Sequence, residues 1–409
     1  MTPLRSRVSR HRLSRHGLSR HRGRPWLVAW LAFLLLAGLP LAGRADNPLA
    51  HLAKGSSFGA DLKPETRKKV IVEVPLVAEK GAHVLLANNR ELKRLGLKPP
   101  ENGLQSATYE KQVLGAFAFR PATPEEIQTK AYTHVGLATR YADKNGAKGV
   151  KGDGRAVLVG DVVVKNRKGR ITGVYDIQVK GIGTGLHPDW KGFGHRHGRE
   201  SLRQALEDAL FSDYLATNGI RTNNWLAVID TGKTIEYPDG GKERAGLLVR
   251  GGNFLRLAHL NLVKDDPAAL RDLVDHVNRT LSMELGRKRS LSLAGLYKVL
   301  TQRKAQEVAD LFFLRTVHGS STYDNIGLVE NMDHGTGSTV DRTHKNYSFF
   351  SKWVGFGGEP AFILSRYYET ELLGFLKQVA HGAERKALDA IKPAALTSGM
   401  LEHRMRYQL

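Results

Sequence analysis

The chain has 409 residues, and its 62 Lys and Arg against 40 Asp and Glu give a formal net charge of +22 at pH 7. This length can bury a sizeable core, and the absence of cysteine from the sequence excludes disulfides, thiolate metal sites and cysteine nucleophiles. The basic charge suits phosphates, anionic lipids or acidic partners. The interleaved basic and aromatic pattern of an RNA-binding sheet is not visible, so no nucleic-acid partner is expected.

The first 45 residues predict a secretory signal peptide. They contain nine arginines and no acid, and an apolar run at 26–42 is followed by the small residues Gly43 and Ala45. Cleavage after Ala45 would export residues 46–409 to the periplasm or the extracellular space. The alternative is an uncleaved signal that anchors the chain, the only membrane contact expected, although a run interrupted by Pro40 is marginal for a spanning helix.

Residues 46–255 are predicted to be rich in strands. A helix is expected at 199–217, where leucines recur every fourth residue from Leu202 and Gly219 can end it. The Pro-rich connection 120–124 is expected to cap a short helix. Strands are predicted at 70–77, 156–164, 173–180, 225–229 and 245–249, with a hairpin turn at 168–169 and turn signals around 239–240.

Residues 256–409 are predicted to be helical. Asp266-Pro267 is typical of a helix start, and that helix is expected to end near Leu285. Further helices are predicted near 291–299, 302–317, 363–381 and 383–391. The sequence therefore predicts an α+β, bilobal fold with a strand-rich N-lobe at 46–255, a helical C-lobe at 256–409 and a ligand cleft. No pattern specifies an oligomeric state.

A catalytic pattern lies in the helical half. Asp324-Asn325 stands eight residues ahead of the Asp333-His-Gly335 motif. Magnesium takes few protein oxygens and keeps the rest of its shell for water and phosphate. Kinase-like phosphate chemistry uses the same parts, a base Asp with an Asn and an Asp on the metal.

The remaining parts of a nucleotide site lie upstream in the expected order. Gly152-Asp-Gly154-Arg155 is a glycine turn whose backbone N–H groups could approach phosphate, although a plain turn is the simpler interpretation. Lys180 ends a strand and could hold phosphate or simply be solvated. A helix acid could pair with it, but spacing does not decide between Glu207 and Asp208.

Two further groups have competing interpretations. Arg250 and Arg256 flank a glycine segment and could grip a triphosphate or make ordinary surface or interlobe ion pairs. The histidines His187, His195 and His197 lack the helical spacing and fourth ligand of a zinc site, so zinc is not expected.

Taken together, these residues resemble the SelO (selenoprotein O) family, kinase-fold proteins that transfer AMP rather than phosphate to protein hydroxyls. The matching phrases span about residues 150–341. They are 152–156, 176–183, 198–203, 218–222, 256–259, 318–325 and 333–335.

The resemblance implies a role for each motif. Asp324 would accept a proton, and Asn325 and Asp333 would hold Mg²⁺ or Mn²⁺. His197 stands where the family has Asp, and the helix acid falls on Asp208 where the family has Glu. The nucleotide-binding set implied by the resemblance is Gly152, Gly154, Arg155, Lys180, His197, Gly198, Asp208, Arg250 and Arg256.

The expected function is therefore Mg²⁺-dependent transfer of AMP from ATP to Ser, Thr or Tyr hydroxyls of protein substrates. In the family, ATP lies flipped relative to protein kinases, so that the α-phosphate faces the acceptor and pyrophosphate leaves. Export would take the chain to a compartment poor in ATP. The alternative is accordingly a non-catalytic envelope protein that binds a nucleotide or another anion in a kinase-like cleft. A conventional kinase, with the opposite ATP orientation, is the third hypothesis.

Overall fold

The computed structural model describes residues 61–94, 106–142, 151–152, 155–165, 171–183, 198–237, 239–319, 324–330, 332–334, 337–339 and 362–408. The expected signal peptide at 1–45, Gly154 and His197 lie outside the described residues. All described residues fall in one compact unit. Among them, no helix is long and apolar enough to cross a membrane.

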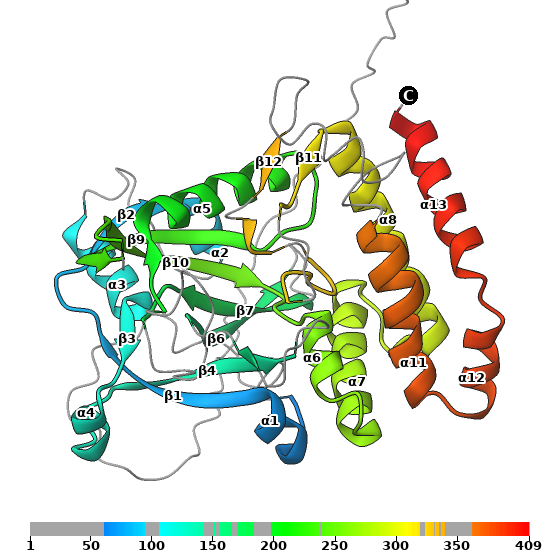
Figure 1. Ribbon diagram of the computed structural model, residues 1–409, viewed down its shortest axis with the longest axis horizontal. Helices are drawn as coiled ribbons and strands as arrows, with labels where there is room; N and C mark the ends of the chain where they lie inside the picture. The colour runs from blue at the N-terminus through cyan, green and yellow to red at the C-terminus, as the bar shows by residue number, and fades with distance from the viewer. Residues whose placement is uncertain are drawn as a thin grey trace, which may run out of the picture. The chain divides into compact units, whose positions relative to one another are not determined.

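A large antiparallel sheet makes up most of the first half of the described chain (Figure 1). Its main path runs in the order β2-β9-β10-β7-β6-β4-β1-β3, with β5 paired to β4 and β8 paired to β10. The strands are β1 Ile71–Ala78, β2 His83–Ala87, β3 Phe119–Pro121, β4 His134–Tyr141, β5 Lys151–Gly152, β6 Ala156–Lys165, β7 Ile171–Lys180, β8 Glu200–Ser201, β9 Asn224–Glu236 and β10 Lys242–Gly252.

The predicted pair of strands β6 and β7 is confirmed, with Val157 opposite Val179 and Leu158 opposite Gln178. The predicted turn at 168–169 lies outside the described residues. Alternation along β7 places Ile177 and Val179 in the core, as expected. The opposite face is also buried, since Asp176, Gln178 and Lys180 are each at most 6% exposed. Polar side chains on that face, including Lys180, are therefore inside the protein.

The predicted strands at 225–229 and 245–249 form the hairpin β9–β10, but both strands are longer than predicted. The apolar pattern ends where the hairpin leaves the core, whereas pairing continues through exposed residues such as Glu236 and Lys242. The expected turn is present at its tip. There, the Asp239 carboxylate accepts a hydrogen bond from Gly241 N at 2.9 Å, and Gly240 takes a positive φ of 83°.

Five helices accompany the strands in the described residues. They are α1 Pro64–Val70, α2 Asn89–Arg94, α3 Ala107–Phe117, α4 Pro124–Gln128 and α5 Leu202–Thr217. The Pro-rich connection caps α4 as predicted, through a capping box of Thr123 and Glu126. Helix α5 starts three residues later than predicted, because Glu200 and Ser201 pair with β10 before Ser201 caps the helix.

The second half of the described chain is helical, as predicted. Its elements are α6 Leu257–Leu262, α7 Pro267–Glu284, α8 Leu293–Phe313, the two-stranded pair β11 Thr316–Val317 and β12 Ser338–Thr339, the π-helix η3 Ile363–Leu372, α11 Leu373–Val379, α12 Gly382–Asp389 and α13 Pro393–Gln408. Asp266 caps α7 as the sequence indicates. The prediction of two helices at 291–299 and 302–317 is wrong, since no Gly or Pro breaks α8 near Leu300.

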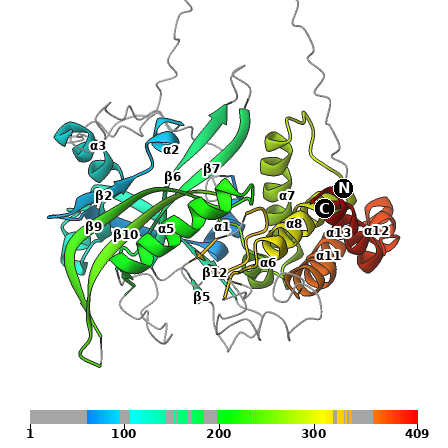
Figure 2. The ribbon, with the colours of Figure 1, turned by 90° about the horizontal axis from the view of Figure 1, so that it is seen from above.

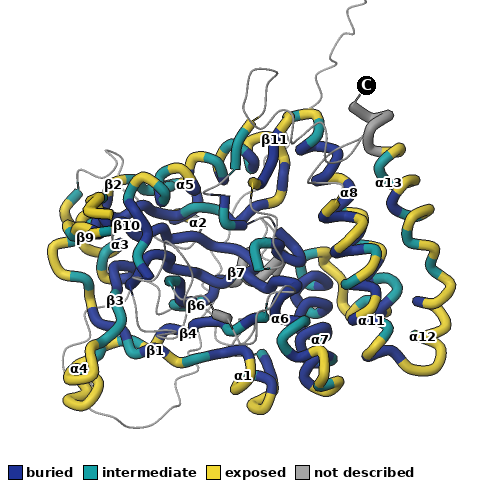
Figure 3. Tube along the Cα trace, viewed as in Figure 1, coloured by how far each residue is buried: buried dark blue, intermediate teal, exposed yellow. Residues whose placement is uncertain are grey.

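Buried residues run through both the sheet and the helices (Figure 3), and the apolar ones form two large clusters. The cluster of the helical half also includes Ile71, Tyr141 and Leu158 from the strands. The sheet packs Ile177 and Leu226 against Phe117 of α3, while α7 and α8 enclose Leu273 and Tyr297. Helix α5 crosses strands β9 and β10 (Figure 2) and buries Ala209 against them. The α+β fold class is confirmed. The sheet ends at β10 and the helices begin at α6, with the segment that carries both arginines close to this junction.

Candidate functional site

Lys180 lies at the centre of a buried ion cluster. Its ammonium Nζ is 2.9 Å from Asp208 Oδ2, 3.2 Å from Asp333 Oδ1 and 3.3 Å from Glu200 Oε1. Only 3% of the residue is exposed, which excludes the solvated strand lysine. Burial alone would lower the pKa of Lys180, but the three carboxylates outweigh it and raise that pKa above its usual value. The lysine is therefore a fixed cation, and any phosphate that binds it must replace or join these carboxylates.

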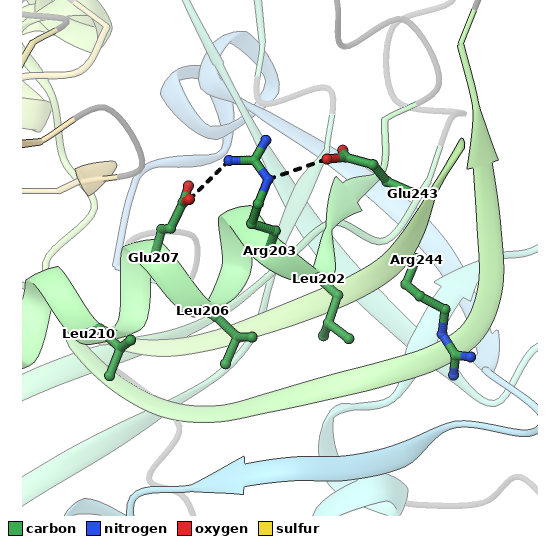
Figure 4. Close-up of a pocket in the computed structure, with 7 residues that line it drawn as sticks. All are labelled: Leu202, Arg203, Leu206, Glu207, Leu210, Glu243 and Arg244. Atoms are coloured by element: carbon green, nitrogen blue, oxygen red, sulfur yellow. Dashed lines mark hydrogen bonds and ion pairs between the residues drawn. The ribbon is translucent and has the colours of Figure 1, made fainter. Parts of the chain in front are cut away.

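The helix acid that pairs with Lys180 is Asp208, and Glu207 is excluded. Asp208 is 2% exposed and faces the sheet, whereas Glu207 points outward and binds Arg203 at 2.9 Å. Figure 4 shows Glu207 and Arg203 beside Leu206 and Leu210 along an outer apolar groove of about 410 Å³. The shorter aspartate reaches the lysine directly, so the strand-lysine and helix-acid pair implied by the resemblance is present.

Asp208 is also held by other groups in the cluster. Its Oδ1 accepts a hydrogen bond from the backbone N–H of His334 at 3.1 Å, and Arg250 Nη1 lies 3.6 Å from Oδ2. Burial would raise the pKa of Asp208, but the charges of Lys180 and Arg250 outweigh it and lower the pKa to about 2. The carboxylate stays ionised at any pH near neutrality.

The two arginines converge on Asp333. Arg250 Nη2 lies 2.7 Å from Asp333 Oδ1, and Arg256 Nη2 lies 3.3 Å from Asp333 Oδ2. Arg250 also donates to Gln178 Oε1, at 2.9 Å from Nε and 2.7 Å from Nη2. Arg256 Nη1 donates to the backbone oxygen of Asp324. Each arginine is 2% exposed. Ordinary surface pairing is therefore excluded, and Arg256 links the two motifs of the catalytic pattern.

The carboxylate of Asp333 forms ion pairs with three cations, Lys180, Arg250 and Arg256. Its backbone φ of 59° is left-handed, a conformation that Asp tolerates better than most residues. Burial would raise its pKa, but Arg250, Lys180 and Arg256 hold the pKa well below its usual value. The residue before it is fixed by His318, whose Nε2 lies 2.6 Å from the Met332 carbonyl oxygen. The motif is thus held as an anion inside the protein.

Asp324 and Asn325 lie half-buried beside this cluster. The Oδ1 atom of Asp324 is buried and has no hydrogen-bond partner within the described part of the chain. An ionised carboxylate accepts hydrogen bonds through both oxygens, and burying one of them without a donor is unfavourable. This oxygen therefore has an unused capacity to accept a hydrogen bond within the described residues.

The glycine motifs border the cluster. Arg155 Nη1 lies 2.8 Å from Glu200 Oε2, and the Arg155 carbonyl accepts from Gly181 N at 2.6 Å, next to Lys180. Gly198 has a left-handed φ of 63° and accepts a hydrogen bond from Gly183 N. Gly152 belongs to β5 and pairs with β4. Gly154 and His197 lie outside the described residues, so their assignment stays a prediction.

Two members of the cluster were missed by the sequence analysis. Gln178 lies two residues before Lys180 on the same face of β7, so alternation could have indicated it. Glu200 precedes α5 and is 1% exposed, yet it has no distinguishing spacing in the sequence. Both neutralise or orient a cation of the site.

Asp333 and Asn325 carry carboxylate and amide oxygens, the ligand types that Mg²⁺ prefers. A divalent cation at Asp333 would compete with Lys180, Arg250 and Arg256 for the same oxygens. That competition would be relieved if phosphate oxygens took over the three cations. Metal and nucleotide are therefore expected to bind together.

Comparisons with known proteins agree with the sequence resemblance. The family model of protein adenylyltransferase SelO matches residues 67–351. A protein nucleotidyltransferase YdiU of Alkalilimnicola ehrlichii is 32% identical, over 47% of this chain and 37% of the relative. The protein nucleotidyltransferase YdiU of Aromatoleum aromaticum is 28% identical, over 49% of this chain and 41% of the relative. The protein nucleotidyltransferase YdiU of Agrobacterium fabrum is 26% identical, over 75% of this chain and 56% of the relative. The chain thus spans about two fifths of the first two relatives.

Among solved structures, a Toxoplasma gondii rhoptry antigen kinase domain matches with 11% identity, over 66% of this chain and 76% of that one. Its TM-score of 0.27 is too low to bear on the fold.

Proposed function

We propose that this chain, which belongs to the family of protein adenylyltransferase SelO, transfers AMP from ATP to Ser, Thr or Tyr hydroxyls of other proteins with the help of Mg²⁺. The proposal rests on one observation above all. Three buried cations, Lys180, Arg250 and Arg256, surround the carboxylate of Asp333, and Arg256 also donates to the backbone oxygen of Asp324. Such a site can hold a polyphosphate and take up a proton.

The cations would bind the phosphates of ATP. Arg250 and Arg256 present planar donor groups that suit phosphate oxygens, and Lys180 adds a point charge. Their fixed positions matter because preorganised charges in a dry site stabilise developing negative charge better than water does. Asn325 and Asp333 would hold the Mg²⁺, which supplies charge neutralisation on the phosphates when bound.

In the proposed transfer step, Asp324 is the proton acceptor. Its carboxylate takes the proton of the acceptor hydroxyl while a bond forms between the hydroxyl oxygen and the α-phosphorus. The bond from that phosphorus to the bridging oxygen of the β-phosphate breaks, and pyrophosphate leaves. The products are an AMP-modified protein and pyrophosphate, with the proton on Asp324. A kinase would instead place the γ-phosphate beside Asp324.

Parallel labelling of protein from α-labelled and γ-labelled ATP tests this proposal. We expect the full chain with Mg²⁺ to label protein from the α-position alone. Asp324→Asn should keep Mg²⁺-dependent ATP binding and lower transfer by roughly 10²- to 10⁴-fold, the usual effect of removing a general base. Label from the γ-position would make the protein a kinase. Binding of ATP without label from either position would favour the non-catalytic binding protein, with steep salt sensitivity and little metal dependence.

We also propose that the protein is exported. The support is the arginine-rich start and the apolar run 26–42 in the sequence. Expression of the chain in a bacterium, followed by fractionation and intact-mass measurement, should give a periplasmic product that begins at Asp46. A cytoplasmic product that retains Met1 would exclude export, and a membrane-bound product of full mass would indicate the uncleaved anchor.

A further inference from the structure

We infer that Glu330 is a positioning residue, whose buried carboxyl group ties the segment carrying Asp324, Asn325 and Asp333 to the end of β10. The inference rests on the proposed function, because these are the residues to which that function assigns the chemistry. Glu330 lies six residues after Asp324 and three before Asp333, and it is 7% exposed. It contacts no member of the ion cluster in any hydrogen bond or ion pair found among the described residues.

One oxygen of Glu330 joins two other segments. Glu330 Oε2 accepts a hydrogen bond from the backbone N–H of Asn253 at 2.8 Å and another from Asn223 Nδ2 at 2.9 Å. Asn253 lies between Arg250 and Arg256 in the sequence, so the first bond fixes the backbone that carries both arginines. The second bond reaches the residue that precedes β9. The carboxyl group therefore connects three parts of the chain that meet at the site.

The bond to Asn223 extends the connection to helix α5. The carbonyl oxygen of Asn223 accepts a hydrogen bond from Ser212 Oγ, one turn after Asp208 in α5. The neighbouring Thr222 hydroxyl hydrogen-bonds with His334 Nε2, directly after Asp333. Each of these bonds ends within four residues of a member of the ion cluster. A shift of Glu330 would therefore displace the segments that carry the members of the ion cluster.

The surroundings of Glu330 leave no room for a ligand. The cavity beside it measures about 10 Å³, enough for about one water molecule. A Cβ atom added to Gly252 would stand 2.3 Å from Glu330 Oε2 and 2.4 Å from Asn223 Nδ2. The carboxyl group is therefore packed against a glycine backbone. Its contacts are structural, and its effect on the reaction must pass through the segments that it joins.

The hydrogen-bond acceptor at Glu330 Oε2 distinguishes two substitutions. Burial raises the pKa of Glu330 to about 7, with Glu284 raising it further, while Asn253, Asn223 and Arg221 act in the opposite direction. Tyr175 also lines the cavity beside it. Both the neutral acid and the carboxylate can accept hydrogen bonds at Oε2. The amide oxygen of a Gln can do the same, whereas Ala cannot.

Transfer kinetics of Glu330→Gln, Glu330→Ala and Gly252→Ala in the full chain test the inference. We expect Glu330→Ala to lower kcat at least 10-fold with the KM for ATP changed less than threefold, because Arg250 stays in β10, whose pairing with β7 and β9 does not involve Glu330. Glu330→Gln should restore kcat to within about threefold of wild type. Gly252→Ala should lower kcat to a similar extent, because the added Cβ atom would displace the carboxyl group of Glu330. The matched control is Glu307→Gln, at an equally buried glutamate of α8 that pairs with Lys304 at 2.7 Å.

Two outcomes would overturn the inference. One is a kcat for Glu330→Ala no lower than that of Glu307→Gln, and the other is a Glu330→Gln variant as impaired as Glu330→Ala. If the wild type transfers no AMP, the proposed function fails, but positioning is still measurable by hydrogen exchange. Amides of 324–334 should then exchange at least 10-fold faster in Glu330→Ala and Gly252→Ala than in Glu307→Gln, and equal rates would reject a positioning role.

Discussion

Replacing Asp333 with Asn should lower AMP transfer by roughly 10²- to 10⁴-fold, about 3–5 kcal/mol of transition-state stabilisation. The reason is the assigned metal contact. An amide is a poorer ligand than a carboxylate for Mg²⁺, and charge on the phosphates then goes uncompensated as the bond to pyrophosphate breaks. Initial rates with α-labelled ATP, at saturating nucleotide and metal, measure the effect.

The same substitution should strengthen binding of metal-free ATP. In the structure, the carboxylate of Asp333 neutralises Lys180, Arg250 and Arg256, at distances of 2.7 to 3.3 Å. An uncharged Asn releases these cations for phosphate oxygens. Calorimetry should therefore show a severalfold lower Kd for ATP without metal, together with a smaller gain on adding Mg²⁺.

The control for Asp333→Asn is Asp230→Asn. Asp230 has a side chain of similar exposure, 7% against 13%, and binds Arg244 at 2.6 Å. It lies on the β9–β10 hairpin, and it contacts no member of the ion cluster through any ion pair of the described residues. We expect this variant to transfer AMP at a rate close to wild type. If Asp333→Asn transferred AMP as fast as Asp230→Asn, Asp333 would have no role in catalysis.

The order of motifs along the sequence predicted the site better than any single motif. Lys180, Asp208, Arg250 and Asp333 come from four separate segments, yet they lie within one cluster. Local patterns could not choose between Glu207 and Asp208, because adjacent helix positions differ by about 100° and either could face the sheet. That choice is decided by packing, which buries Ala209 and Asp208 on the same side.

Residues that act through long-range contacts could not be predicted. Glu330 and Asn223 are 107 positions apart, and nothing near either residue in the sequence indicates that they pair. The same holds for the ends of β9 and β10, where pairing in register extends strands past their apolar segments. For helix α8, the sequence analysis predicted a break that the structure does not contain. Its sequence suggested two helices, but propensity alone allows one, and packing of Leu296 and Leu300 in the core favours the continuous form.

Replacing Lys180 with Met should abolish detectable transfer and lower the free energy of unfolding by about 3–5 kcal/mol at pH 7. Met preserves the apolar volume of the side chain but leaves three buried carboxylates without their shared cation, an arrangement that costs about this much. The control is Lys304→Met, at a lysine that is also 3% exposed and pairs with Glu307 in α8. It should lose similar stability, measured by urea unfolding, and still bind Mg²⁺ and ATP. Equal transfer by the two variants would show that Lys180 stabilises the fold without holding phosphate.

The pH dependence separates the ion pair from simple packing. In the wild type, the pKa of Asp208 is lowered to about 2 by Lys180 and Arg250 against the effect of burial, below the usual value of 3.8. A lowered carboxyl pKa contributes stability that is present above the unfolded pKa and is lost as the pH falls through the folded one. In Lys180→Met, the pKa of Asp208 should rise, so that this carboxyl protonates at a higher pH and the repulsion disappears. The stability gap between wild type and variant should therefore be largest at pH 7 and narrow as the pH falls from about 4 toward 2. A gap that stays constant over that range would mean that Met fails through its shape rather than through the missing charge.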